Sequence, residues 1–199
     1  MVTESAELGV FDKDDPKVTK PVLPNAVLGV LLFITAESMM FAGLISGHVI
    51  LKANAAGAWP PPGQPMLPAS STAFNTLLLI LSGVCLWYAG RQWTRDRVQT
   101  KTPFLVATIL GASFIGLQGV EWTKLIAVGL TMTSSSYGSF FYLIVGMHAL
   151  HAIFALFFLV KMYLQLLRGQ LGDEGFQALR VFWYFVVGLW PILYVLVYL

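Results

Sequence analysis

The sequence predicts an all-α membrane protein, a bundle of five transmembrane helices with the N-terminus inside the cell and the C-terminus outside. Of the 199 residues, 57% are hydrophobic and only 11% are charged, and the mean hydropathy is +0.73. Soluble domains contain about 25% charged residues, so this chain lacks the polar surface of a water-facing globule, which excludes a soluble enzyme. The basic residues do not alternate with aromatic ones, so no nucleic-acid partner is expected.

Five apolar runs are long enough to be these helices, because a span needs roughly 20 mostly apolar residues. They are residues 25–52, 70–92, 103–127, 138–166 and 178–198. The first run begins directly after Pro24, and the second follows the segment WPPPGQPMLP, in which proline prevents a helix or a central strand. That segment should form a stiff outer loop with Trp59 at the membrane interface. Isolated polar groups interrupt the third and fourth runs, and the fifth contains Pro191, which should kink its helix.

Residues 1–24 are expected to form a cytoplasmic N-terminal segment, and residues 25–199 a single transmembrane domain. The segment mixes acidic and basic side chains and has no apolar run of its own, so it is not expected to be a cleavable signal peptide. The orientation follows from the excess of basic residues on one side of the membrane. On the inner side are Lys13, Lys17, Lys20, Arg91, Arg95, Arg97, Lys101, Lys161, Arg168 and Arg180, and on the outer side are Lys52 and Lys124.

Glu37 is the clearest candidate functional residue, because ionisable groups inside a span are rare and costly. Counted from Asn25 at about 1.5 Å per residue, it lies ~18 Å into the bilayer, near the middle. A carboxylate there costs at least ~2.5 to 3.5 kcal/mol unless it is protonated, paired or wetted by internal water. Two roles fit this position: a proton-handling group, and a protonated carboxyl that is hydrogen bonded to a neighbouring helix.

His148 and His151 lie three residues apart and therefore share one face of the fourth span. His148 is expected at nearly the depth of Glu37, within contact range of it. Interhelical hydrogen bonding or lipid contact is favoured over metal ligation, because no cysteine and no HExxH or Glu-x-x-His pattern accompanies the pair. His48 lies near the outer end of the first span, where an interfacial position needs no special role.

Glu121 lies towards the outer end of the third span, with Lys124 three residues later. An ion pair with Lys124, or a contact with a lipid headgroup or another subunit, would satisfy this carboxylate. A structural role is therefore favoured over a catalytic one. No residue of the chain is predicted to be catalytic or to bind a metal.

The stretches TAESMMFAGL, WPPPGQPMLP, FNTLLLILSG, LQGVEW, SSYGSFFYLIVGMHALHA and FWYFVVGLWPILYVLVYL follow one another along the chain. In this order and spacing they resemble subunit III of the haem-copper oxidases, in the cytochrome c oxidase branch. The resemblance covers nearly everything from residue 25 to the end. It implies a five-helix form of the subunit, without the first two helices of the seven-helix mitochondrial form, as is common in bacteria.

The resemblance also implies an accessory subunit of the bacterial plasma membrane, docked on subunit I of a proton-pumping oxidase. Subunit II, small subunits or a larger respiratory supercomplex would be further partners, and membrane phospholipid would be bound in a cleft. Haems and copper are expected in the partner subunits and not in this chain, whose three histidines are too few to hold them. The carboxylate matching Glu37 would support proton uptake and the stability of subunit I, and the histidines matching His148 and His151 would pack the bundle.

The last helix departs from the family, which usually reads Trp-His-Phe-Val-Asp where this chain has WYFVV at 183–187. No site is therefore carried over to Tyr184 or Val187. Two other functions remain open. One is a subunit III-like component of a quinol oxidase or nitric oxide reductase. The other is an independent channel or transporter whose pathway includes Glu37 and His148, against which the lack of an internal repeat argues.

Overall fold

A computed structural model describes residues 23–55 and 59–199, and over these residues it contains helices and no strand. The helices are α1 (Asn25–Asn54), α2 (Ala69–Trp93), α3 (Arg97–Ala127), α4 (Ser136–Leu167) and α5 (Asp173–Leu193), followed by the short π-helix η1 (Tyr194–Tyr198). Five helices are long and apolar enough to cross a membrane, which confirms the predicted fold class. Most of the predicted N-terminal segment, residues 1–22, lies outside the described residues, and the orientation of the termini remains a prediction.

The helices extend beyond the apolar runs, chiefly at their N-terminal ends. α3 begins at Arg97 and not at 103, and α5 begins at Asp173 and not at 178. The reason is that hydropathy detects only the apolar part of a helix, whereas caps stabilise polar turns outside it. The Asp96 side chain accepts a hydrogen bond from the backbone N–H of Val98 at 2.8 Å. In α5 the helix continues past Pro191 and widens to the π-helix at Tyr194.

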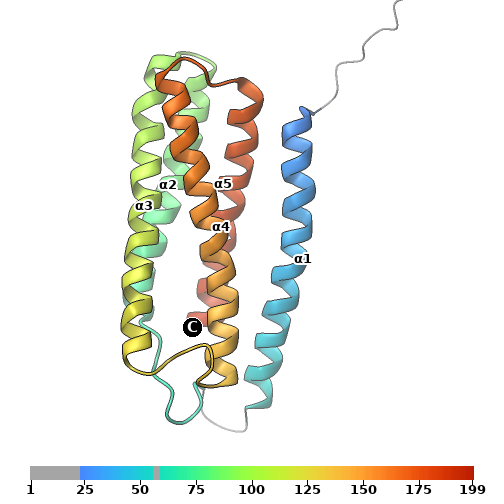
Figure 1. Ribbon diagram of the computed structural model, residues 1–199, viewed down its shortest axis with the longest axis vertical. Helices are drawn as coiled ribbons and strands as arrows, with labels where there is room; N and C mark the ends of the chain where they lie inside the picture. Colours follow the sequence, from blue (N-terminus) through green and yellow to red (C-terminus); the bar gives the residue numbers. More distant parts are fainter. Residues whose placement is uncertain (1–22, 56–58) are drawn as a thin grey trace, which may run out of the picture.

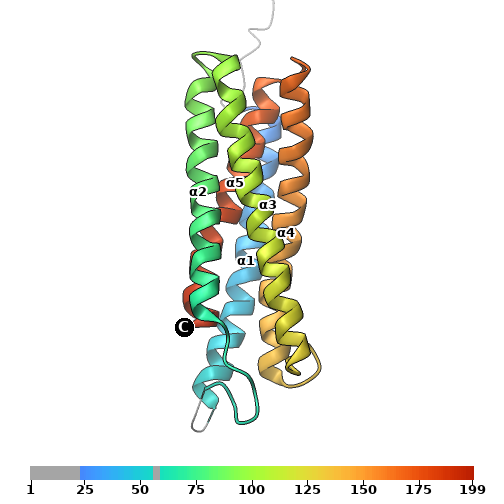
Figure 2. The same cartoon turned by 90° about the vertical axis from the view of Figure 1, so that its left-hand side faces the viewer.

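The helices run roughly along the long axis of the molecule, and α1 stands at one side of the other four (Figures 1 and 2). α1 contacts α4, α5 and η1, whereas α2 packs closely on α3. Only 6% of the apolar window of α1 is buried, against 33% to 39% for the other four helices. The first helix is therefore peripheral, and few packing contacts hold it.

The two ends of the bundle differ in charge. One end, at the top of Figure 1, contains the start of α1 and the connections from α2 to α3 and from α4 to α5. We call it the basic end, because all the Lys and Arg residues of the described helices and loops except Lys52 and Lys124 lie towards it. The opposite end contains Trp59, the connection from α3 to α4 and the C-terminus.

Two fully buried tryptophans of α5 link this helix to α2 inside the bundle. The indole Nε1 of Trp183 donates to Ser82 Oγ at 3.2 Å, and that of Trp190 donates to Thr76 Oγ1 at 2.9 Å. Gly111 of α3 lets the ring of Trp183 approach, since a Cβ at this position would lie 2.7 Å from it. Such hydrogen bonds and small residues are what associates helices in lipid, where no hydrophobic driving force acts between them.

Candidate functional site

Glu37 of α1 and His151 of α4 meet within the membrane-spanning part of the bundle. His151 Nε2 lies 3.1 Å from Glu37 Oε2, and the side chains are 8% and 18% exposed. The other ring nitrogen of His151, Nδ1, lies 2.7 Å from the carbonyl oxygen of Met147. Because a carbonyl can only accept, Nδ1 carries the hydrogen and donates it to the preceding turn of its own helix.

This assignment leaves Nε2 to face the carboxyl group, and the contact is uncharged overall when it holds one further proton. Either a protonated Glu37 faces a neutral imidazole, or a carboxylate faces an imidazolium, and both states are neutral overall. Oε2 of Glu37 has no aligned hydrogen-bond partner among the described residues, so the 3.1 Å contact with His151 is close but poorly directed. A carboxyl group and an imidazole in such a contact can share a proton inside the membrane.

Two phenylalanines of α1 cover the imidazole of His151. The ring centroids of Phe33 and Phe41 lie 6.0 Å and 5.7 Å from that of His151, and Phe41 is 1% exposed. They precede and follow Glu37 by four residues and so flank it by about one helical turn on each side. The pair is therefore flanked by two apolar rings of α1, of which Phe41 is buried and Phe33 is 42% exposed.

His148 does not contact Glu37 as the depth argument suggested. It points away from α1 and lies 5.0 Å, centroid to centroid, from the indole of Trp190 on α5. A spacing of three residues separates the two imidazoles by about 60° around the helix axis. Counting along the axis fixes the depth of a residue but not this rotation, and α1 packs on the side of His151.

Glu121 and Trp59 lie nearer the opposite end. Glu121 Oε1 accepts a hydrogen bond from Lys124 Nζ at 3.0 Å, as the sequence suggested. Trp59 lies between His48 and Tyr137, with ring centroids 5.5 Å and 5.2 Å away. His48 lies near the end of α1, as expected, and is 1% exposed, because neighbouring side chains of the bundle cover it. The proline-rich loop folds back over the end of α1 and covers this imidazole.

The structure accounts for the two departures in the last helix. The Arg180 guanidinium packs against Gly90 of α2, and its Nε donates to Tyr184 Oη at 3.2 Å. One turn further on, Val187 packs against Gly83 of α2, where a Cβ would lie 3.0 Å from Val187 Cγ1. Tyr184 thus accepts a hydrogen bond from a basic residue of its own helix, and Val187 makes an apolar contact between α5 and α2. Sequence reasoning missed Arg180, because it was counted only as a loop charge.

An apolar groove of about 380 Å³ runs between α1 and the pair α4 and α5, towards the basic end. Its walls include Ala26, Phe33, Phe158, Met162 and Phe182. The ammonium group of Lys161 lies at the same level, 5.8 Å from the ring centroid of Phe158. The shape and lining of this apolar groove, with a cation beside it, suit an acyl chain with a phosphate headgroup.

Within residues 23–55 and 59–199, no group of three or more His, Cys, Asp or Glu side chains could hold a metal ion.

Comparison with known proteins gives consistent matches. The family model described as cytochrome c oxidase subunit III matches residues 12–199. Among curated relatives, the cytochrome c oxidase subunit 3 proteins of Pelomedusa subrufa and Petromyzon marinus are each 32% identical over 189 residues, which cover 90% of this chain and 71% of the relative. The protein of the same name from Oncorhynchus mykiss is 33% identical over 189 residues, with the same coverage of 90% and 71%.

Proposed function

Because the chain belongs to the cytochrome c oxidase subunit III family, we propose that it is the accessory, cofactor-free subunit III of a proton-pumping cytochrome c oxidase. In this role it docks directly on subunit I, close to subunit II. The haems, the copper and the reduction of O2 to water belong to those partners. The chain itself supports proton uptake, binds lipid and stabilises subunit I.

The observation that carries the proton-related role is the contact between Glu37 and His151. The two groups lie 3.1 Å apart in the spanning part of the bundle, and a carboxyl group and an imidazole in contact can share one proton. A neutral pair lowers the cost of placing a carboxyl group in lipid while keeping its proton available. Such a pair can buffer the protons that enter subunit I.

The lipid-binding role rests on the groove of about 380 Å³ between α1, α4 and α5. We propose that a phospholipid acyl chain lies in this groove, with its phosphate near Lys161. The excess of basic residues at one end supports the orientation with this end inside, in the plasma membrane of a bacterial cell. Labelling of residues at the basic end with a membrane-impermeant reagent tests the orientation. These residues should react in opened cells but not in intact ones.

The test of the proton-related role is Glu37→Gln in the assembled oxidase. We expect normal assembly, but slower turnover at high pH or a shorter active lifetime, because an amide cannot release the proton. Glu121→Gln is the matched control: it also removes a carboxyl group from a span, but one paired with a lysine that is 65% exposed. Unchanged activity, lifetime and pH profile in Glu37→Gln would leave Glu37 with a structural role.

Affinity purification of the tagged chain in mild detergent tests the assembly. Haem absorbance together with subunit I and a copper-binding subunit II is the expected result. A haem-containing complex without a copper-binding subunit II would indicate a quinol oxidase or nitric oxide reductase. A colourless chain without partners would indicate an independent channel or transporter.

A further inference from the structure

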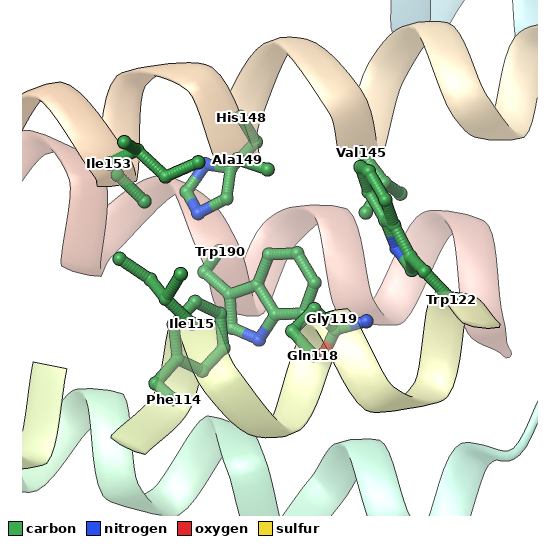
Figure 3. A pocket seen from close by; sticks show the side chains of 11 residues that line it. Phe114, Ile115, Gln118, Gly119, Trp122, Val145, His148, Ala149, Ile153 and Trp190 are labelled. Carbon is green, nitrogen blue, oxygen red and sulfur yellow. The ribbon is translucent and has the colours of Figure 1, made fainter. Parts of the chain in front are cut away.

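A second polar position lies inside the bundle, away from the contact between Glu37 and His151. A cavity of about 140 Å³ is lined by α3, α4 and α5 and is open on one side, where Ile153 is 53% exposed. Figure 3 shows it from close by, with the ring of His148 directed from α4 towards Trp190 and the side chains of α3. The lining residues are Phe114, Ile115, Gln118, Gly119, Trp122, Val145, His148, Ala149, Ala152, Ile153 and Trp190.

Three polar atoms of the lining are buried without a protein hydrogen-bond partner in the described part of the chain. They are Nδ1 and Nε2 of His148 and Nε1 of Trp122. His148 itself is 1% exposed. A neutral imidazole has one donor and one acceptor, and an indole has one donor. Buried polar groups in proteins are nearly always paired with protein or with ordered water, so these atoms require partners.

Gln118 supplies a further polar atom to the same cavity. Its Nε2 donates to Tyr198 Oη at 2.9 Å, and its Oε1 accepts only a long hydrogen bond of 3.5 Å from Asn75. A carbonyl oxygen has two lone pairs, so Oε1 can accept another hydrogen bond. The lining is largely apolar, and its polar groups are a donor on Trp122, an acceptor on Gln118, and one group of each kind on His148.

We propose that this cavity is a binding site for a small cluster of water molecules, which bridge His148, Trp122 and Gln118. A water molecule occupies about 30 Å³ in the liquid, so 140 Å³ holds up to about four. Water is the small ligand that both donates and accepts. An acyl chain entering past Gly119 and Ile153 would fill the volume but leave all the unpaired atoms unpaired. A metal ion would find one imidazole and no carboxylate in the lining.

The site does not depend on the function proposed above. It does, however, place polar groups on two sides of α4: His151 faces α1 and Glu37, and His148 faces the hydrated cavity. Because the two histidines are three residues apart, they lie within one helical turn. The water cluster makes His148 a group that exchanges its proton inside the membrane, which a dry cavity would not permit.

The experiment is a structure of the intact complex that contains this chain, in lipid nanodiscs, at a resolution that shows ordered water. We expect isolated density within hydrogen-bond distance, about 2.7 to 3.2 Å, of a His148 ring nitrogen and of Trp122 Nε1. His148→Leu should abolish the density beside residue 148, and Ile153→Leu, a volume-matched change in the same lining, should keep it. If His148→Leu fails to assemble, Trp122→Phe should remove the water that accepts from the indole. An empty cavity, or continuous density of an acyl chain in the wild type, would overturn the proposal.

Xenon provides a second readout, because dry apolar cavities of this size bind it. We expect no xenon in the wild-type cavity and xenon in the same place in His148→Leu. Xenon in the wild type at full occupancy would show a dry cavity and contradict the water site.

Discussion

Substitution of Gly111 by alanine should strongly destabilise the packing of α3 on α5. The new Cβ would lie 2.7 Å from both Cζ2 and Cη2 of Trp183, whereas carbon atoms pack at about 3.5 to 4.0 Å. The indole is fully buried and cannot swing outward. The ring must therefore move by roughly 1 Å inside a close-packed core.

The magnitude follows from what this displacement disturbs. Overpacking a core costs about 1 to 3 kcal/mol. The shift also strains the hydrogen bond of 3.2 Å from Trp183 Nε1 to Ser82 Oγ, and losing it costs about 0.5 to 1.5 kcal/mol. Together these effects amount to about 2 to 4 kcal/mol. Replacing glycine by alanine also stabilises a helix by up to ~1 kcal/mol, because alanine has the higher helix propensity. The same substitution at a second glycine serves as a control, so that this contribution can be subtracted.

Gly116 provides that control, because it lies on the same helix and nothing is within 4 Å of a Cβ built there. Reversible unfolding in mixed micelles, followed by helical circular dichroism, should show Gly111→Ala less stable than Gly116→Ala by about 2 to 4 kcal/mol. Equal stability of the two variants, within about 0.5 kcal/mol, would refute the conclusion that Gly111 is needed for the approach of Trp183.

Three further changes have defined outcomes. In a double-mutant cycle of Glu37→Gln and His151→Gln, the coupling in the free energy of unfolding should be about 0.6 to 1.7 kcal/mol, and a value near zero would mean that the groups do not interact. Val187→Asp should lower the free energy of unfolding by about 2.5 to 3.5 kcal/mol, because it places a carboxylate against Gly83 within the span, and wild-type stability would show that water reaches this contact. Glu121→Gln should change the thermal midpoint little, because the carboxylate, 11% exposed, is paired with a lysine that is 65% exposed, and a pair screened by solvent on one side contributes less than about 1 kcal/mol; a large drop would reveal a buried network.

The sequence predicts the fold well because lipid leaves the backbone few choices. A segment in hydrocarbon must satisfy its own hydrogen bonds, so an apolar run of sufficient length becomes a helix. The same reasoning locates the helix ends poorly, as the capped turn that begins α3 at Arg97 shows. Asp96 and most of the residues in the first turn after it are polar, and their helix is stabilised by hydrogen bonds that hydropathy does not detect.

The side of a helix that faces the core is harder to predict. Met39 is 72% exposed and Phe41 is 1% exposed, although both are apolar and two residues apart on α1. In water this difference would be visible as an amphipathic pattern, but in lipid both faces are apolar. For the same reason the sequence identified Glu37 and the pair of histidines as polar groups within the spans, but not that His151 is the one that meets Glu37. It also gave no indication that Val187 packs on Gly83.

The energetics of Glu37 and His151 favour a functional explanation of the pair. α1 is the least buried helix, so an added polar link could help to hold it. Interhelical hydrogen bonds in membranes, however, contribute about 0.6 kcal/mol on average and at most ~1.7 kcal/mol. A carboxylate near the middle of a span costs at least ~2.5 to 3.5 kcal/mol, so the charged pair destabilises the folded state overall. In the neutral pair, the hydrogen bond at most offsets the cost of placing the polar groups in the span. A leucine at both positions would hold α1 as well without this cost. This balance supports the proton-related role that we propose for Glu37, because the cohesion of α1 does not by itself account for a polar pair at this place.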